Sequence, residues 1–352
     1  MKIGFLIYNL QGGGAERVVS NLANQFVNVG YETFIFLFAK EDIKYKLDSR
    51  VKIIACDIKK TGNRYYRTLR RIRLIRHQLL KVKPDILFAF TVSMVPYALI
   101  STIGMQCKVI GTERANPKTH TKGYQLVIKY LSELCDGYIF QTKGALNYYP
   151  KKTGSKAVVI GNPLSGRLCE WKKIPGMRIC TVGRLHDDKD FFTLIYAFKE
   201  FHKFYPQSSL TIFGEGPLKE HLVNHVEKLK LKNAVCFKGF VEDLSSQIAE
   251  YSVFAFSSKS EGMPNALMEA LAAGMPCIST DCEFGPGELI EQGRNGILVK
   301  TGNAEELKEA LIWMAEHEDE RISMGAEAKK ILETYSVDKI TEQYRRYAEL
   351  IS

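Results

Sequence analysis

The chain opens with MKIGFLIYNLQGGGAE, residues 1–16, in which an apolar run leads into three consecutive glycines. The run from Lys2 to Tyr8 is rich in β-branched and aromatic residues and predicts a strand. Apolar residues at helical spacing then predict a helix from Ala15 to Val29. Strand, turn and helix in this order are typical of a parallel α/β sheet. No cleavage site precedes them, so we expect a cytoplasmic protein whose mature form starts at or near Met1.

The alternation of strand and helix continues through the chain in two rounds. Further strand-like runs of the first round are TFIFLF (33–38), DILFAF (85–90), CKVIGT (107–112), GYIFQT (137–142) and AVVIGN (157–162). Those of the second are RICTVG (178–183), SLTIFG (209–214), AVCFKG (234–239), VFAFSS (253–258), PCIST (276–280) and GILVK (296–300). Between the rounds, residues 162–177 carry two prolines and predict a linker.

This pattern predicts an α/β protein of two doubly wound, Rossmann-like domains that face each other across a cleft. We place the domains at 1–165 and 175–335, followed by a helical tail over 336–352. Ligands of such sheets bind outside the carboxyl ends of the strands. The loops that follow the strands are therefore the candidates for a functional site.

Composition limits the class of protein. The 352 residues are 45% hydrophobic, enough for a large core, and no apolar run reaches the roughly 18 residues of a membrane span. The eight cysteines are scattered without a close Cys-x-x-Cys pair or a neighbouring histidine cluster. They are typical of reduced thiols, and they predict neither disulfides nor a metal site.

The net charge of +10 is concentrated in the first half of the chain. Residues 1–170 have 27 Lys and Arg against 11 Asp and Glu, whereas the remainder has 22 against 28. The densest part, Arg64 to Lys83, predicts an amphipathic basic helix suited to an anionic membrane surface. An ordinary solvated helix face explains this segment equally well. Nucleic acid also fits the charge, but no recognition motif accompanies it.

The glycine loop LQGGGAER, residues 10–17, ends the first strand and opens a helix, so its backbone N–H groups could meet an anion. It lacks the Lys-Ser/Thr of a phosphate-binding Walker loop. It also departs from the dinucleotide fingerprint, because Arg17 stands at the third glycine position. A tight structural turn is the alternative interpretation.

Two loops of the second domain have the chemistry of a nucleotide site. In TVGRLHDDKD, residues 181–190, Arg184 and Lys189 lie just before a helix and could hold a diphosphate. In FGEGPLKEHL, residues 213–222, Gly214 and Gly216 would let a nucleoside lie close to the backbone. Surface charge and a plain strand-to-helix turn are the respective alternatives.

The most informative segment is SEGMPNALMEALAAGMP, residues 260–276, which places Glu261 and Glu269 eight positions apart. Pro264 is typical of the first turn of a helix, which continues over Asn265–Ala273. Glu261 then precedes the helix, while Glu269 stands inside it among apolar neighbours, where simple solvation is an awkward explanation. Two such carboxylates could hold hydroxyl groups at both ends of one ligand.

These segments together resemble the retaining, nucleotide-sugar-dependent glycosyltransferases of family 4, which have the GT-B fold and act in bacterial polysaccharide and lipid-linked oligosaccharide biosynthesis. The resemblance covers nearly the whole chain and includes GELIEQGRNGILV, residues 287–299. It implies that the first domain is the acceptor side and the second the donor side. It also implies that the tail helix crosses back onto the first domain.

The resemblance implies a role for each site residue. Arg184 and Lys189 match the pair that neutralises the donor diphosphate, and Glu261 the acid beside the reacting sugar. Residues that border the donor are Gly13, Gly14, Gly183, Gly214, Val241, Met263, Pro264, Asn265, Ala266 and Glu269, the last on the ribose. Glu16, Glu113 and Arg114 fall on the acceptor side. Arg114 stands where many members have a histidine, and a salt bridge to Glu113 or to another acid is its alternative interpretation.

The predicted reaction is transfer of a hexosyl or N-acetylhexosaminyl group from a nucleotide sugar, with UDP favoured, to a polyprenyl-diphosphate-linked saccharide at the inner leaflet. We expect no metal and no other cofactor, with Arg184 and Lys189 in place of a divalent ion. A nucleotide-sugar epimerase of the same architecture and a non-catalytic nucleotide-sugar-binding module remain open alternatives. A dehydrogenase is weaker because the glycine fingerprint is incomplete.

Overall fold

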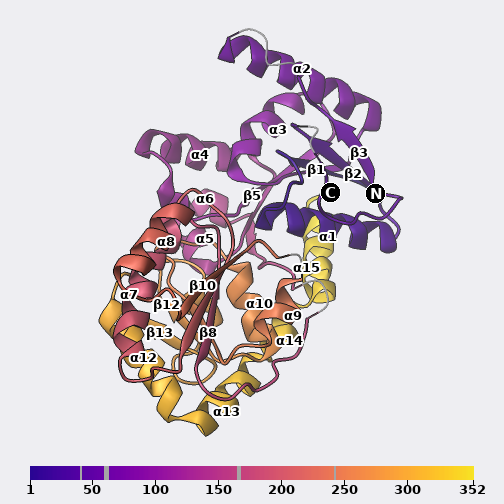
Figure 1. Cartoon of the computed structure of the whole chain (residues 1–352). Helices are drawn as coiled ribbons and strands as arrows, with labels where there is room; N and C mark the ends of the chain where they lie inside the picture. Colours follow the sequence, from indigo (N-terminus) through magenta and orange to yellow (C-terminus); the bar gives the residue numbers. More distant parts are fainter. Residues whose placement is uncertain (40–41, 59–62, 165–167, 242) are drawn as a thin grey trace. The chain divides into compact units, whose positions relative to one another are not determined.

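The computed structural model describes residues 1–39, 42–58, 63–164, 168–241 and 243–352. The chain forms two compact units, one of Met1–Pro163 with Tyr335–Ser352 and one of Leu164–Thr334 (Figure 1). Each unit is built around one parallel sheet with helices packed on it. The predicted α/β class with two doubly wound sheets is confirmed. None of the helices in the described ranges is long and apolar enough to cross a membrane.

The first unit has a seven-stranded sheet in the order β3-β2-β1-β4-β5-β6-β7. Its strands are β1 (Lys2–Ile7), β2 (Glu32–Leu37), β3 (Lys52–Ala55), β4 (Ile86–Ala89), β5 (Lys108–Glu113), β6 (Gly137–Phe140) and β7 (Ala157–Val159). Its helices are α1 (Gly14–Asn28), α2 (Arg64–Val82), α3 (Val95–Ser101), α4 (Lys122–Leu134), α5 (Lys143–Tyr148), α6 (Lys151–Gly154) and α15 (Val337–Ile351). Two 3₁₀ turns, Val92–Met94 and Pro117–Thr119, follow β4 and β5.

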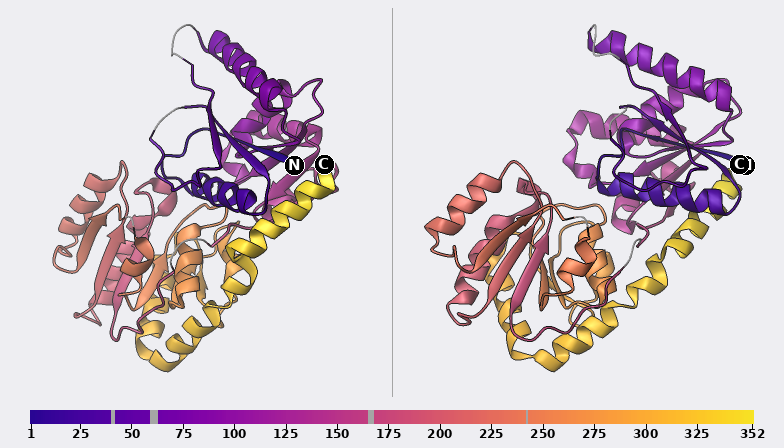
Figure 2. Two further views of the ribbon diagram at one scale, coloured as in Figure 1. Left: turned by 90° about the vertical axis from the view of Figure 1, so that its right-hand side faces the viewer. Right: turned by 45° about the vertical axis from the view of Figure 1, so that its right-hand side comes forward.

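Large apolar side chains fill the first unit. Phe5 on β1 is fully buried and stacks on Phe88 of the neighbouring β4, with ring centroids 5.2 Å apart, and on Phe26 of α1 at 5.9 Å. Burying each such ring contributes about 1.5–3 kcal/mol relative to its exposure. α15 packs against α1, so the end of the chain completes this core (Figure 2).

The second unit has a six-stranded sheet in the order β10-β9-β8-β11-β12-β13. Its strands are β8 (Arg178–Val182), β9 (Ser209–Phe213), β10 (Val235–Gly239), β11 (Val253–Phe256), β12 (Cys277–Thr280) and β13 (Ile297–Val299). Its helices are α7 (Phe191–His202), α8 (Lys219–Lys228), α9 (Leu244–Ile248), α10 (Asn265–Ala273), α11 (Pro286–Leu289), α12 (Ala304–Glu316), α13 (Glu318–Ala328) and α14 (Ile331–Tyr335). A 3₁₀ turn, Asp187–Lys189, precedes α7.

Part of the predicted linker belongs to the second unit. Trp171 is 5% exposed, its indole N–H donates to the carbonyl of Tyr251 at 2.7 Å, and its backbone N–H donates to that of Ala273 at 2.8 Å. These bonds attach the segment to α10 and to the start of β11. The hinge-like part of the linker is therefore shorter than the sequence indicated, and positions 165–167 lie outside the described residues.

Candidate functional site

The strand order of the second unit creates a switch point between β8 and β11. Both strands are parallel neighbours, but the chain leaves β8 toward one edge of the sheet and reaches β11 only after building that edge with β9 and β10. In these folds the usual ligand site is the crevice outside the carboxyl ends of the strands at such a point. Lys189 follows β8 and Glu261 follows β11, so both belong to this crevice.

Lys189 and Glu261 form a close ion pair through Nζ and Oε1. The Lys189 side chain is 17% exposed and that of Glu261 is 11% exposed. Asp188 adds a second, longer contact, with its Oδ2 3.7 Å from the same ammonium. The predicted diphosphate-binding lysine and sugar-binding acid are thus brought together, although 72 positions separate them.

Backbone contacts hold the two loops side by side. The hydroxyl of Ser257 donates to the carbonyl of Lys189 at 2.8 Å, and the N–H of Lys259 donates to the carbonyl of Asp188 at 2.7 Å. Lys259 also pairs with the buried Asp190, 3.0 Å from Nζ to Oδ1. The contributions of Ser257, Lys259, Asp188 and Asp190 were not predicted from the sequence. The Ser-Ser-Lys run directly after β11 was the available signal, because it lies at a carboxyl strand end.

The helix after Glu261 is α10, and its bounds match the predicted range. The expected position of Pro264 was off by one residue, because Pro264 is the N-cap with extended backbone angles and the first turn begins at Asn265. Gly274 ends the helix with φ at 81°, a left-handed conformation that glycine adopts without strain. Met263 and Pro264 are buried, Asn265 and Ala266 half-buried.

Glu269 lies in the second turn of α10 and is only 4% exposed. Its neighbours Leu267, Met268, Ala270 and Leu271 are buried apolar side chains. A carboxylate among such neighbours is expensive to desolvate unless polar groups meet it, so its position argues against a merely solvated surface acid.

The glycines of the β8 and β9 loops pack on each other. A Cβ on Gly214, whose φ is +130°, would lie 2.0 Å from the carbonyl oxygen of Gly183. A Cβ on Gly216 would lie 2.4 Å from the carbonyl oxygen of Leu185. Backbone approach within the protein therefore explains both glycines, and their predicted place beside a nucleoside stays a prediction. Arg184 is exposed on this loop, and Val241, after β10, is half-buried.

Cys282 is a neighbour of the ion pair that sequence reasoning missed. It follows β12 and is 3% exposed. Burial, and next the charge of Glu261, raise the pKa of its thiol to about 12, while Lys189 acts in the opposite direction. The thiol is therefore protonated and chemically inert at neutral pH.

In the first unit, Gly13 and Glu16 share the start of α1. Gly13 is the N-cap, and a Cβ there would lie 2.1 Å from Oε2 of Glu16, so the carboxylate folds back over the glycine. The hydroxyl of Tyr45 donates to the carbonyl of Gly13 at 2.8 Å. Gly14 begins the helix and is exposed. The loop thus presents a carboxylate as well as backbone N–H groups.

Glu113 ends β5 and is 2% exposed. The hydroxyl of Tyr149 donates to its Oε2 at 2.6 Å, and the N–H groups of Arg114 and Ala115 donate to its Oε1 at 3.0 and 3.3 Å. Burial raises the pKa of the Glu113 carboxyl, and these hydrogen bonds oppose the rise. The carboxylate therefore shapes the loop that follows β5.

The Arg114 side chain contacts the C-terminal helix α15. Its guanidinium donates to Oδ1 of Asn162 at 3.1 Å and to the hydroxyl of Tyr344 on α15, and it lies 4.2 Å from the ring centroid of Phe90. Burial lowers its pKa. The proposed salt bridge to Glu113 is not the contact that forms, because only the Arg114 backbone N–H binds that acid.

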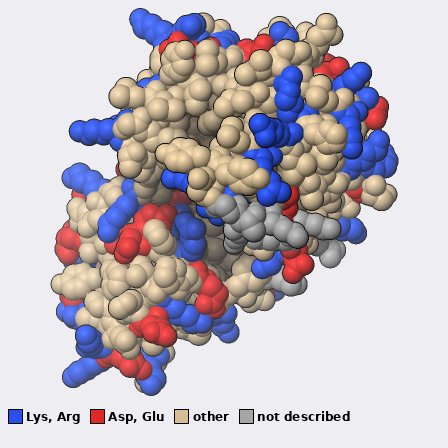
Figure 3. Space-filling model, turned by 90° about the horizontal axis from the view of Figure 1, so that it is seen from above, with Lys and Arg blue, Asp and Glu red and all other residues tan. Residues whose placement is uncertain are grey.

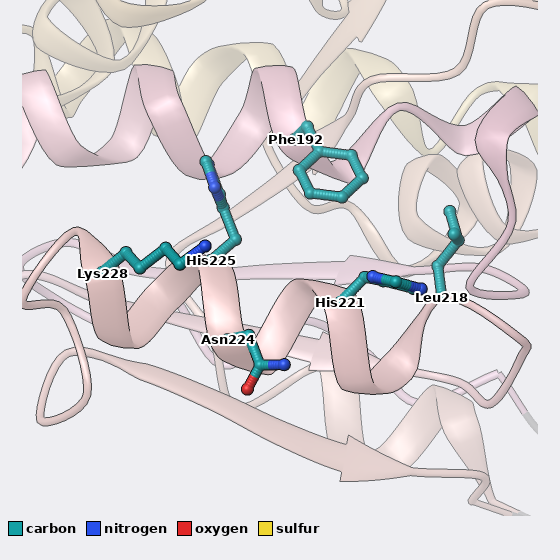
Figure 4. Close-up of a pocket in the computed structure, with 6 residues that line it drawn as sticks. All are labelled: Phe192, Leu218, His221, Asn224, His225 and Lys228. Carbon is teal, nitrogen blue, oxygen red and sulfur yellow. The ribbon is translucent and has the colours of Figure 1, made fainter.

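A pocket of about 450 Å³ lies between α7 and α8 (Figure 4). Its lining residues are Phe192, Leu218, His221, Asn224, His225 and Lys228. None of the predicted site residues lines it, and it lacks an acid. We therefore assign the candidate site to the β8–β11 crevice. In the part of the chain that the structure describes, no group of three His, Cys, Asp or Glu side chains is arranged to hold a metal ion.

Comparisons with known proteins agree with this architecture. Residues 12–165 match the family Glycosyltransferase Family 4, and residues 175–331 match Glycosyl transferases group 1. The chain is 26% identical to an uncharacterized glycosyltransferase of Haemophilus influenzae, over 98% of this chain and 99% of that one. It is 27% identical, with the same coverage, to the N-acetylgalactosamine-N,N'-diacetylbacillosaminyl-diphospho-undecaprenol 4-alpha-N-acetylgalactosaminyltransferase of Campylobacter jejuni.

The structure of HepE from Anabaena in complex with UDP and glucose superposes on this chain with a TM-score of 0.87, at 18% identity and over 99% of both chains. That likeness establishes the fold. The two family matches together span most of the chain, one on each unit. The protein therefore belongs to the glycosyltransferases of family 4 and has the GT-B fold.

Proposed function

We propose that the protein transfers a hexosyl or N-acetylhexosaminyl group from a nucleotide-diphosphate sugar, with UDP-sugars favoured, to a lipid-linked saccharide, with retention of anomeric configuration. The observation that carries the proposal is the pairing of Lys189 with Glu261 at the β8–β11 switch point. UDP bound to HepE and the diphospho-undecaprenol acceptor in the name of the Campylobacter relative support the donor and acceptor classes.

The diphosphate would be held by cations of the β8 loop. Lys189 is already confined by Glu261 and Asp188, so its ammonium is in place before a donor arrives. Arg184, exposed on the same loop, can supply a bidentate partner for phosphate oxygens. Cations fixed in this way stabilise the leaving group without reorganisation during the reaction, and removing one such donor typically costs about 100–1000-fold in kcat.

The remaining donor contacts would come from α10 and the glycine loops. Glu261 would accept from hydroxyls of the transferred sugar and Glu269 from those of the ribose. The nucleoside would border Gly183, Gly214 and Val241, and the sugar and phosphate would lie at Met263–Ala266. The N-terminal end of a helix favours negative charge, which suits the diphosphate there.

Retention would follow from attack on the face that the leaving group vacates. The acceptor hydroxyl oxygen bonds to the anomeric carbon as the bond from that carbon to the phosphate oxygen breaks. The hydroxyl proton passes to an oxygen of the departing diphosphate. No side chain is singled out as a nucleophile, and Lys189 and Arg184 would take the role of a divalent ion.

The first unit would bind the acceptor. Glu16 supplies a carboxylate that can orient the attacking hydroxyl, and the N–H groups of Gly13 and Gly14 beside it would border the donor. Glu113 and Arg114 are occupied by internal contacts, so we assign them to the wall of this region, where they set the loop after β5.

A lipid-linked acceptor would bring the enzyme to the inner face of the cytoplasmic membrane as a peripheral protein. The basic helix α2 can contribute only some of its cations. Arg76 donates to the carbonyls of Ser101 and Ile103 at 3.1 and 2.6 Å, and Arg71 lies 4.7 Å from the ring centroid of Phe38. Those two arginines serve packing, which leaves Arg64, Arg67, Arg70 and Arg73 for lipid phosphate.

The test is a panel of UDP- and GDP-sugars incubated with the purified protein and a lipid-linked saccharide extract, with EDTA present. We expect acceptor-dependent release of nucleoside diphosphate from one donor. Interconversion of a donor without acceptor would support the epimerase instead. Binding of a donor without turnover under any condition would support a non-catalytic module.

A further inference from the structure

Helix α4 is amphipathic with its apolar side turned outward. Leu126, Val127, Tyr130 and Leu134 are 71, 50, 65 and 51% exposed. At about 100° per residue, these four side chains occupy less than a third of the helix circumference. Single exposed apolar residues are ordinary on protein surfaces, but a continuous apolar strip marks an interaction site. We call these four residues the α4 strip.

The α4 strip has no part in attaching the helix to its unit. The buried positions of α4 are Ile128 and Ser132, on the opposite side. The hydroxyls of Ser132 and Thr153 share a hydrogen bond of 2.7 Å, and α4 packs against α3 and α6 (Figure 1). A helix that buries Ile128 and Ser132 while Leu126 and Leu134 face outward indicates that these two leucines meet something other than this chain.

Cations flank the α4 strip. Lys122 and Lys129 lie on α4 beside it, and Lys151 and Lys152 stand exposed on α6. The one acid within α4, Glu133, is paired with Lys152, 3.3 Å from Oε2 to Nζ. Figure 3 shows how Lys and Arg side chains on the face that it draws stand beside wide uncharged areas. Four lysines against one acid leave the border of the strip positively charged, which is complementary to a surface that is anionic outside and apolar beneath.

We infer that α4 lies in the headgroup layer of an anionic bilayer, with the α4 strip inserted among the acyl chains. The inference deepens the proposed function and rests on it, because a lipid-linked acceptor requires the enzyme to work at a bilayer. Two α4 helices meeting in a symmetric dimer would oppose their own lysines, which disfavours a second copy as the occupant. Helix α2 then adds charge through its outward arginines, while α4 supplies the anchor.

The experiment compares L126Q/Y130Q with the wild-type chain in sedimentation with vesicles of phosphatidylglycerol and phosphatidylcholine. No donor or acceptor is added, so the outcome is independent of transferase activity. We expect wild-type binding that requires phosphatidylglycerol and a partition coefficient at least tenfold lower for L126Q/Y130Q. The matched control is Y196Q/F204Q, which removes side chains 49 and 68% exposed from the second unit and should bind like wild type.

Fluorescence quenching can show whether the α4 strip enters the acyl-chain region or is only attracted to the lipid headgroups. Tryptophan introduced as L126W should be quenched by lipids brominated on the acyl chain, whereas F204W should not. Wild-type-like sedimentation of L126Q/Y130Q would overturn the inference, as would an unquenched L126W. Conversion of a wild-type dimer to a monomer by L126Q/Y130Q, without loss of vesicle binding, would show that a second copy covers the strip. Unchanged circular dichroism of the variants checks that they fold.

Discussion

The ammonium of Lys189 and the carboxylate of Glu261 are in direct contact across two neighbouring loops. Both side chains are more than four-fifths buried. A lysine that already has an anionic partner binds a phosphate only by sharing or exchanging that partner. Glu261 therefore preorganises Lys189 and at the same time competes with the donor for it.

Replacing Glu261 by Gln should separate these two effects. The neutral amide keeps the shape of the side chain but releases the ammonium, so UDP should bind severalfold more tightly. Turnover should fall by about 100-fold or more, because the sugar loses its carboxylate. Isothermal titration with UDP and initial rates with the donor measure both. Weaker UDP binding by E261Q would contradict the competition.

The two glutamates should have distinguishable roles. We expect E269A to weaken UDP binding by about 10-fold or more, the usual scale for hydrogen bonds to a charged group. E261A should leave UDP affinity much closer to wild type and chiefly lower turnover. E269Q, which preserves the volume of this buried side chain, controls for a packing defect. Equal UDP affinity of E269A and E261A would refute the assignment.

The bounds of α10 could be predicted from the sequence, because Pro264 directly precedes the helix and Gly274 directly follows it. The edge strand β3 escaped prediction because it has four residues and no alternation, and Ile53 is 42% exposed. The contact between Lys189 and Glu261 could not be read from the chain, because it depends on β11 pairing with β8, and the order of strands in a sheet is not a local property.

The glycine packing makes a stability prediction. G216A places a methyl group against the backbone of Leu185, and overpacking of this kind costs about 1–3 kcal/mol. Chemical denaturation should show that loss, and UDP affinity should fall with it because the Gly183–Leu185 loop is displaced. G123A is the matched control, since nothing lies within 4 Å of a Cβ there. A G216A as stable as wild type would show that the loops yield freely.

Glu113 makes a pH prediction. Its pKa lies above the ordinary 4.5 because of burial, so the folded state holds its proton more tightly than the unfolded state. Stability from this group is complete at low pH and declines as pH rises from about 4.5 through the raised folded value. The free energy of unfolding of wild type relative to E113Q should therefore fall across that interval and then level off. A difference that grows with pH would mean that folding lowers the pKa of Glu113 instead of raising it.

The contact between Arg114 and Tyr344 predicts that α15 can open on its own. Y344A removes the hydroxyl bound by Arg114 and a ring whose centroid lies 5.8 Å from that of Phe88. Loss of a buried aromatic side chain costs about 3–5 kcal/mol. Hydrogen exchange should rise first in Val337–Ile351, while Y344F, which keeps the ring, should show a smaller rise. Uniform exchange across the first unit would mean that α15 does not open separately.

Because Tyr335–Ser352 belongs to the first unit, the sequence of the second unit is an insertion within the first. On the ribosome, residues 164–334 can complete their own sheet while the earlier sheet still lacks α15. Tyr138, whose N–H donates to the hydroxyl of Tyr347 at 2.8 Å, has its partner 209 residues further along the chain. The half made first is thus finished last, and during synthesis its exposed core is the surface that a chaperone would have to shield.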